Sequence, residues 1–129
     1  MHCQNEYVNN IHKMDRWFLG IEFQTISLDK IGKKDINTNV FIIIKDEMEL
    51  KSSNGETRGM AVIRIKSDLN MRILTHEMGH TLLGHSHSED PHDIMYPYDI
   101  GVEFPSEREL LLAHAIWNRE NLKKYWLVL

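Results

Sequence analysis

The stretch Thr75–Pro97, THEMGHTLLGHSHSEDPHDIMYP, restricts the fold of this 129-residue chain more than any other segment. It holds five histidines, and the first two, His76 and His80, are four residues apart. On an α-helix this spacing places both imidazoles on one face, about one turn apart, so that they can bind one metal ion. Glu77 lies beside the first histidine and can instead hold a metal-bound water, as in an HExxH zinc site.

A third protein ligand is needed, because catalytic zinc usually has three together with a water molecule. Cys3 is the only cysteine, so the ligands must be histidines or carboxylates. If the helix continued past Gly84, His85 would point about 180° away from His76, and His87 would lie about 16 Å along the axis. The helix must therefore end, and Gly84 can adopt the left-handed conformation that turns the chain back.

Two parts of this segment resemble the metzincin clan of zinc endopeptidases, in its matrixin-like branch. The first is HEMGH (76–80), and the second is HSEDPHDIMYP (87–97), which runs from a histidine to a turn with a methionine, DIMYP. The pattern of that clan is H-E-x-x-H-x-x-G-x-x-H followed by a methionine-containing turn. The resemblance covers Leu74–Pro97, about a fifth of the chain. It implies a zinc-bound water activated by Glu77, with Met95 beneath the metal and Pro97 and Tyr98 in the wall of a substrate pocket.

The match departs from the family pattern by one residue, because three residues rather than two separate His80 from Gly84. With His87 as the third ligand, the G-x-x-H spacing and the register to Met95 are both kept, and a bulge in the last helical turn can absorb the extra residue. With His85 as the third ligand, the segment from His80 to that ligand becomes shorter and the segment from the ligand to Met95 becomes longer than in the family, so both must adjust. We therefore predict His87, with His85 as the alternative. Some metzincins have a metal-adjacent tyrosine two positions after the methionine of the turn. That position is Pro97 here, so the alignment gives this role to neither Tyr96 nor Tyr98.

Hydrophobic periodicity predicts the elements around this segment. Tyr7, Ile11, Met14 and Phe18 have the spacing of an amphipathic helix, and KSSNGETRG (51–59) has the composition of a loop. Strands are expected at 21–28, 39–46 and 60–66. The last of these alternates like an edge strand, on which a peptide could lie at Gly59, Met60 and Ala61 by β-augmentation.

Two further helices are expected. Ser67 or Asp68 would cap the helix that carries His76 and His80. Ser106 and Glu109 have the spacing of a capping box at the start of the last helix. The apolar positions of that last helix are Leu112, Ile116, Leu122 and Trp126.

The predicted fold class is α+β, with a small twisted mixed sheet packed on an active-site helix and with N-terminal and C-terminal helices, as in metzincins. We expect a single catalytic domain spanning residues 1–129, because the chain is too short for two ordinary domains.

Net charge limits the classes of partner. A net charge of −4 and a pI near 6.0 argue against nucleic acid and against a basic membrane-binding face. No apolar run reaches the roughly 20 residues of a membrane span, and none resembles a signal peptide. We expect a soluble monomer that acts on a peptide or protein, in the cytoplasm or secreted after removal of a leader.

The predicted function is that of a zinc-dependent endopeptidase, with Zn²⁺ held by His76, His80 and a later histidine. A gluzincin-type site is one alternative, with Glu103 or Glu107 as third ligand. A non-proteolytic, zinc-stabilised protein-binding domain is another. Glu77 favours catalysis, because a structural zinc site needs no base at that position.

Overall fold

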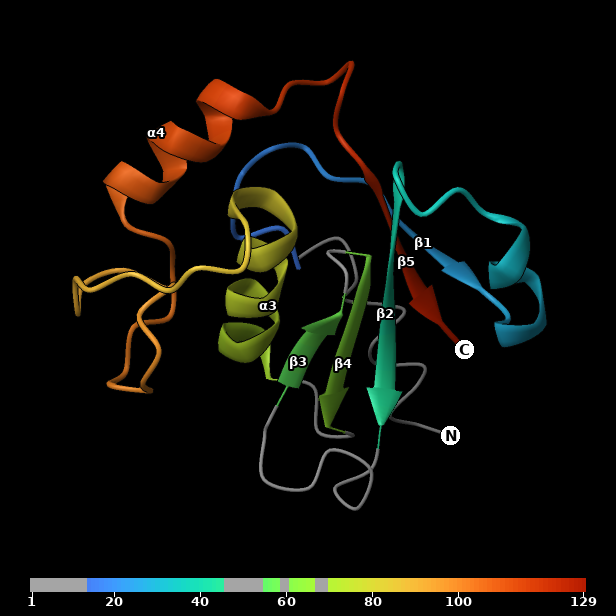
Figure 1. Ribbon diagram of the computed structural model, residues 1–129, viewed down its shortest axis with the longest axis horizontal. Helices are drawn as coiled ribbons and strands as arrows, with labels where there is room; N and C mark the ends of the chain where they lie inside the picture. Colours follow the sequence, from blue (N-terminus) through green and yellow to red (C-terminus); the bar gives the residue numbers. More distant parts are fainter. Residues whose placement is uncertain (1–13, 46–54, 59–60, 67–69) are drawn as a thin grey trace.

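The computed structural model describes residues 14–45, 55–58, 61–66 and 70–129 (Figure 1). Its elements, in chain order, are β1 (Phe23–Ile26), η2 (Leu28–Lys33), β2 (Asn39–Lys45), β3 (Gly55–Arg58), β4 (Val62–Lys66), α3 (Met71–Leu83), α4 (Glu107–Ile116) and β5 (Lys124–Val128). A mixed sheet and helices share this part of the chain, so the predicted α+β class is confirmed at that level.

The sheet has five strands in the order β1-β5-β2-β4-β3. β1, β5, β2 and β4 are parallel to one another, and β3 is antiparallel to β4. The last strand in sequence, β5, lies between β1 and β2 near the middle of the sheet. The strands that surround it are rich in β-branched and aromatic residues, which suit a sheet covered on both faces.

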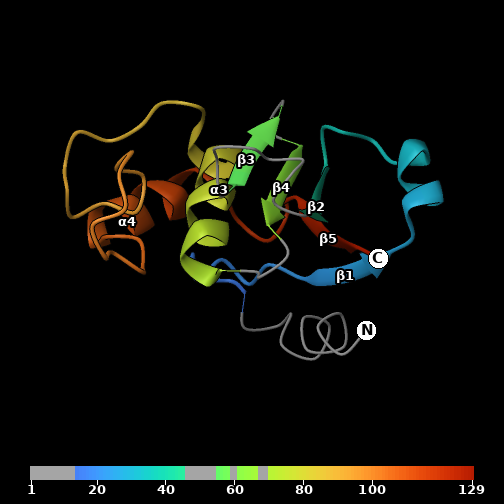
Figure 2. The same ribbon diagram turned by 90° about the horizontal axis from the view of Figure 1, so that it is seen from below.

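Helix α3 packs on one face of the sheet. It contributes Leu74, Met78 and Leu82 to the main core. The strand residues of that core alternate along β2, β4 and β5, as the two-residue period of a strand requires: Val40, Ile42, Ile63, Ile65, Tyr125 and Leu127. In both views α3 lies between the sheet and α4 (Figures 1 and 2). The helix with the histidines is therefore the central layer of the molecule.

Polar contacts fix α3 from several sides. The Trp17 indole N–H donates to the Thr75 carbonyl at 2.9 Å, and the Trp117 indole N–H donates to the Leu82 carbonyl at 2.8 Å. The Thr81 hydroxyl hydrogen-bonds to the hydroxyl of Tyr125 on β5. Such buried polar contacts restrict how the helix can shift or rotate on the sheet.

The described end of the predicted N-terminal helix is not helical. The Asp15 carboxylate accepts hydrogen bonds from four backbone N–H groups, those of Trp17, Leu19, Gly20 and Ile21. This short-range capture competes with helical hydrogen bonding. As a result, Trp17 is fully buried, whereas Phe18 has a positive φ of 54° and is 59% exposed. The preceding part of the predicted helix, residues 7–13, lies outside the described residues.

The expected edge strand was assigned to the wrong segment. β4 pairs with β2 on one side and with β3 on the other, so it lies inside the sheet. β3 occupies the edge, and it forms within the segment predicted to be a loop. Gly59 and Met60 lie outside the described residues, and Ala61 is buried. Pairing to a neighbouring strand has overridden the weak strand propensity of GETR.

The last helix is shorter than predicted. It begins as expected, with the Ser106–Glu109 capping box, but it ends at Ile116. The Asn118 side chain then accepts from the N–H groups of Glu120 and Asn121, which forms a turn. Trp126 lies in β5 rather than in a helix. Leu112 and Ile116 are exposed, so they do not form the predicted core stripe.

Within the described ranges, no helix is long and apolar enough to cross a membrane.

Asn70 is the N-cap of α3, and its side chain accepts from the N–H groups of Arg72 and Ile73. Ser67 and Asp68, the predicted caps, lie outside the described residues.

Candidate metal centre

The end of α3 sets the course of the chain toward the candidate centre. Gly84 has a φ of 103°, and its N–H donates to the His80 carbonyl at 3.1 Å. A positive φ of this size is readily adopted only by glycine. The helix therefore ends where the sequence predicted, and the following chain can return toward the histidines. It is a regular α-helix through Leu83, so the expected bulge in its last turn, which was to absorb the extra residue between His80 and Gly84, is not present.

Three histidines converge at this point. The ligand nitrogens of His76, His80 and His87 all lie within 4.8 Å of one another. The ring centroids of His76 and His80 are 4.9 Å apart, and that of His87 lies 5.3 Å from the former and 4.9 Å from the latter. The His85 ring is 6.2 Å from that of His80 and is not part of the group.

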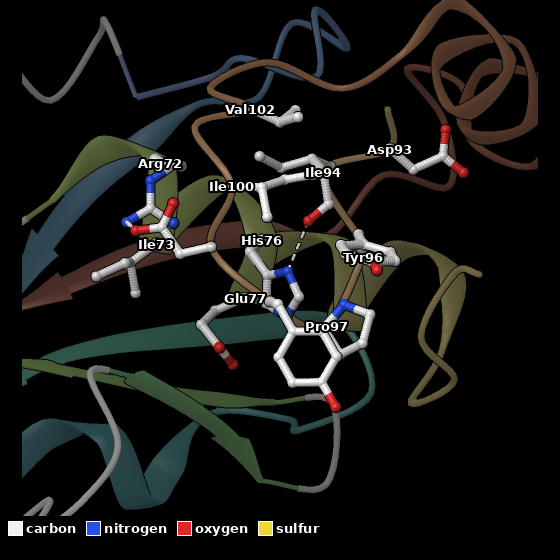
Figure 3. Close-up of a pocket in the computed structure, with 12 residues that line it drawn as sticks. Arg72, Ile73, His76, Glu77, Asp93, Ile94, Tyr96, Pro97, Ile100 and Val102 are labelled. Carbon is white, nitrogen blue, oxygen red and sulfur yellow. Dashed lines mark hydrogen bonds and ion pairs between the residues drawn. The ribbon is translucent and has the colours of Figure 1, made fainter. Parts of the chain in front are cut away.

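Backbone carbonyls orient the two helical imidazoles. His76 Nδ1 lies 2.7 Å from the Ile94 carbonyl oxygen (Figure 3), and His80 Nδ1 lies 3.0 Å from that of Gly84. Because a carbonyl only accepts, each Nδ1 carries the proton and each Nε2 keeps its lone pair. Metal-binding histidines commonly have such a partner, which fixes the tautomer and the ring orientation. The residues present therefore fit a metal ion.

Burial favours the neutral form of both imidazoles. Desolvation lowers the pKa of His76, and electrostatic interactions with His87 and Arg72 lower it further, against the opposing effect of the Ile94 hydrogen bond. Desolvation likewise lowers the pKa of His80. A neutral imidazole is the form that binds a metal, so both side chains are prepared for a ligand role at neutral pH.

Glu77 is placed next to the histidine group and is largely buried, at 7% exposure. Its negative charge acts on His80, where it opposes the lowering of the imidazole pKa. Glu77 also lines the adjacent pocket. Glu77 thus lies beside His76 at a space that a ligand can enter.

The segment Asp93–Pro97, here called the methionine turn, packs against α3 at Gly79. Met95 is buried, and a Cβ atom built on Gly79 would overlap its sulfur atom and lie 2.8 Å from Trp17 Cζ2. The close approach therefore requires a glycine. A glycine inside a helix costs about 1 kcal/mol relative to alanine. The glycine at position 79 of the predicted helix was therefore a sequence signal for a close contact at this point.

Glu109 has a role that the sequence did not reveal. Besides closing the capping box, its carboxylate accepts from the N–H groups of Ile94 at 2.7 Å and of Met95 at 3.0 Å. The Ile94 carbonyl in turn accepts from His76. The first turn of α4 therefore holds the methionine turn that orients one of the three histidines.

A pocket of about 220 Å³ adjoins His76 and Glu77 (Figure 3). Pro97 and Tyr98, the predicted pocket residues, both line it, and Tyr98 is otherwise exposed. Arg72 and Asp99 line it as well and form an ion pair at 2.7 Å. The remaining lining residues are Ile73, Asp93, Ile94, Tyr96, Ile100 and Val102.

Glu103 and Glu107, the alternative third ligands, are both exposed. Neither belongs to the metal-binding group found among the described residues. The geometry therefore favours a third histidine over a glutamate.

No family model, curated protein or solved structure matches the chain. The site must be interpreted from its own geometry.

Proposed function

We propose that the protein is a zinc-dependent endopeptidase of the metzincin clan, in its matrixin-like branch. The observation that carries this proposal is the convergence of three histidine ligand atoms beside a largely buried glutamate. His76, His80 and His87 would hold the ion. A group of three histidines leaves room for a water molecule in a tetrahedral site, as catalytic zinc requires.

Each residue has a distinct part in peptide hydrolysis. A bound zinc ion would polarise the scissile carbonyl and acidify the water beside it. The Glu77 carboxylate takes a proton from the attacking water and returns it to the departing amine nitrogen. Met95 supports α3 beneath the histidines. The carbonyls of Ile94 and Gly84 keep the two helical imidazoles in place.

The substrate is an extended peptide. Among the described strands, β3 lies at the edge of the sheet that is beside α3, so a peptide can pair with its outer side as an additional strand. One substrate side chain would then enter the pocket lined by Pro97 and Tyr98. The lining combines apolar residues such as Ile73, Ile100 and Val102 with polar and charged ones, and the Arg72–Asp99 ion pair forms part of its wall.

Metal analysis combined with cleavage of a peptide library tests this proposal. We expect roughly one zinc ion per chain and cleavage that stops on chelation and returns with zinc. Zinc binding without cleavage of any peptide would favour the non-proteolytic, zinc-stabilised binding domain. A chain that binds no zinc would contradict both.

A further inference from the structure

His87 differs from the other two histidines in how its ring is held. It is exposed, and within the described part of the chain no hydrogen bond holds its imidazole. The rings of His76 and His80 are each fixed by a backbone carbonyl. The position of the His87 ring therefore depends on the backbone next to it.

That backbone is fixed at the following residue, Ser88. Its N–H donates to the Met95 carbonyl at 2.9 Å, and its hydroxyl donates to Asp93 Oδ2 at 2.6 Å. The same hydroxyl accepts from the N–H of Asp90 at 3.0 Å. Ser88 thus attaches the loop that carries His87 to the methionine turn at two points.

Asp93 links this attachment to α4. Its side chain is only 1% exposed, and its second oxygen accepts from the Ser106 hydroxyl at 2.6 Å. It also forms an ion pair with the Arg108 guanidinium, which is itself 64% exposed. A buried carboxylate is tolerated when hydrogen bonds and a counter-charge compensate for its lost hydration. The contacts of Asp93 with Ser106 and Arg108 connect segments 13 and 15 residues apart, which meet only in the folded protein.

We propose that Ser88 and Asp93 are positioning residues for His87: the buried carboxylate holds the Ser88 hydroxyl, and Ser88 holds the backbone that presents the third imidazole. This inference rests on the proposed metal site. Neither residue belongs to the metal-binding group of His76, His80 and His87. They act by placing His87 before the metal arrives, so that binding does not have to order the loop.

The test is zinc affinity measured by competition with a chromophoric chelator. Loss of such outer contacts typically weakens metal binding by about 10–100-fold. We expect Ser88→Ala to weaken zinc binding by roughly tenfold, and Ser88→Thr, which keeps the hydroxyl, to restore most of it. Asp90→Asn is the matched control, because Asp90 lies in the same loop and its carboxylate bonds only to the exposed His92 among the described residues. Its affinity should equal that of the parent.

The Ser88→Ala substitution in a chain that already carries His87→Ala separates a positioning role of Ser88 from an effect on the general stability of the protein. If Ser88 acts through His87, Ser88→Ala should have no further effect on zinc affinity in a His87→Ala chain. The absorption spectrum of bound cobalt should likewise change with Ser88→Ala in the parent only. Equal losses in both backgrounds, or no loss in the parent, would overturn the positioning role while leaving the metal site intact. A parent chain that binds no zinc would overturn the proposed function as well.

Discussion

Gly79 and Met95 are in direct contact, and the contact leaves no room for a side chain at position 79. A Cβ atom there would overlap the Met95 sulfur and lie 2.8 Å from Trp17 Cζ2. Gly79 immediately precedes His80 on α3, and Met95 follows the residue whose carbonyl orients His76. The packing of the methionine turn on α3 is therefore coupled to the geometry of the histidine group.

Gly79→Ala should destabilise the protein although alanine is the better helix former. Overpacking in a core typically costs about 1–3 kcal/mol, which outweighs the helix-propensity gain of about 1 kcal/mol. Because the added Cβ would overlap both Met95 and Trp17, we take the overpacking cost in the upper part of that range and expect a net loss of roughly 1–2 kcal/mol in the free energy of unfolding, measured by urea denaturation. The same substitution should cost less in a Met95→Ala background, where the sulfur is gone. An increase in stability would show that the contact is looser than described.

Glu109→Gln should lower stability much more than Glu107→Gln. Glu109 is buried and its carboxylate accepts three backbone N–H groups, whereas Glu107 is exposed in the same helical turn. The amide keeps one acceptor oxygen and directs N–H groups toward donors. An unsatisfied buried donor costs about 1–3 kcal/mol, so we expect a loss of roughly 2–3 kcal/mol for Glu109→Gln. Equal urea midpoints for the two variants would contradict this assignment.

Local signals predicted the parts of the molecule that local forces determine. The helix with HEMGH, its end at Gly84 and the Ser106–Glu109 capping box each depend on residues within four positions of one another. The strand at 39–45 was predicted because its side chains are apolar or β-branched on both faces.

Long-range pairing decided the parts that the sequence did not predict. Trp126 follows Leu122 at helical spacing, yet the segment Lys124–Val128 gains more by pairing with β1 and β2. Glu109 bonds to the backbone of Ile94 and Met95, which lie 15 and 14 residues earlier in the chain, and hydrophobic periodicity does not predict contacts over that separation. Nothing local indicates that Asp93 is buried, because its partners Ser106 and Arg108 lie 13 and 15 residues further along the chain.

Glu77→Gln should abolish hydrolysis while leaving metal binding and fold unchanged. The substitution is nearly isosteric and does not touch the imidazoles, but an amide cannot take a proton from water. General-base catalysis contributes about 100–10,000-fold, so we expect at least a hundredfold loss in kcat. Zinc content and the thermal midpoint serve as controls. Cleavage at the parent rate would show that the water is activated by another group.

Replacing His87 and His85 separately tests which histidine completes the metal site. The His87 ligand nitrogen lies within 4.8 Å of those of the two helical histidines, whereas His85 is outside this group. His87→Ala would leave two imidazoles, too few for tight binding at a catalytic zinc site. His85→Ala removes an exposed side chain at the turn after Gly84 and should change zinc affinity little. Both variants keep the contacts of Ser88 with Met95 and Asp93, so they form a matched pair for metal titration. The reverse order of affinities would mean that the chain after Gly84 brings His85, rather than His87, to the metal.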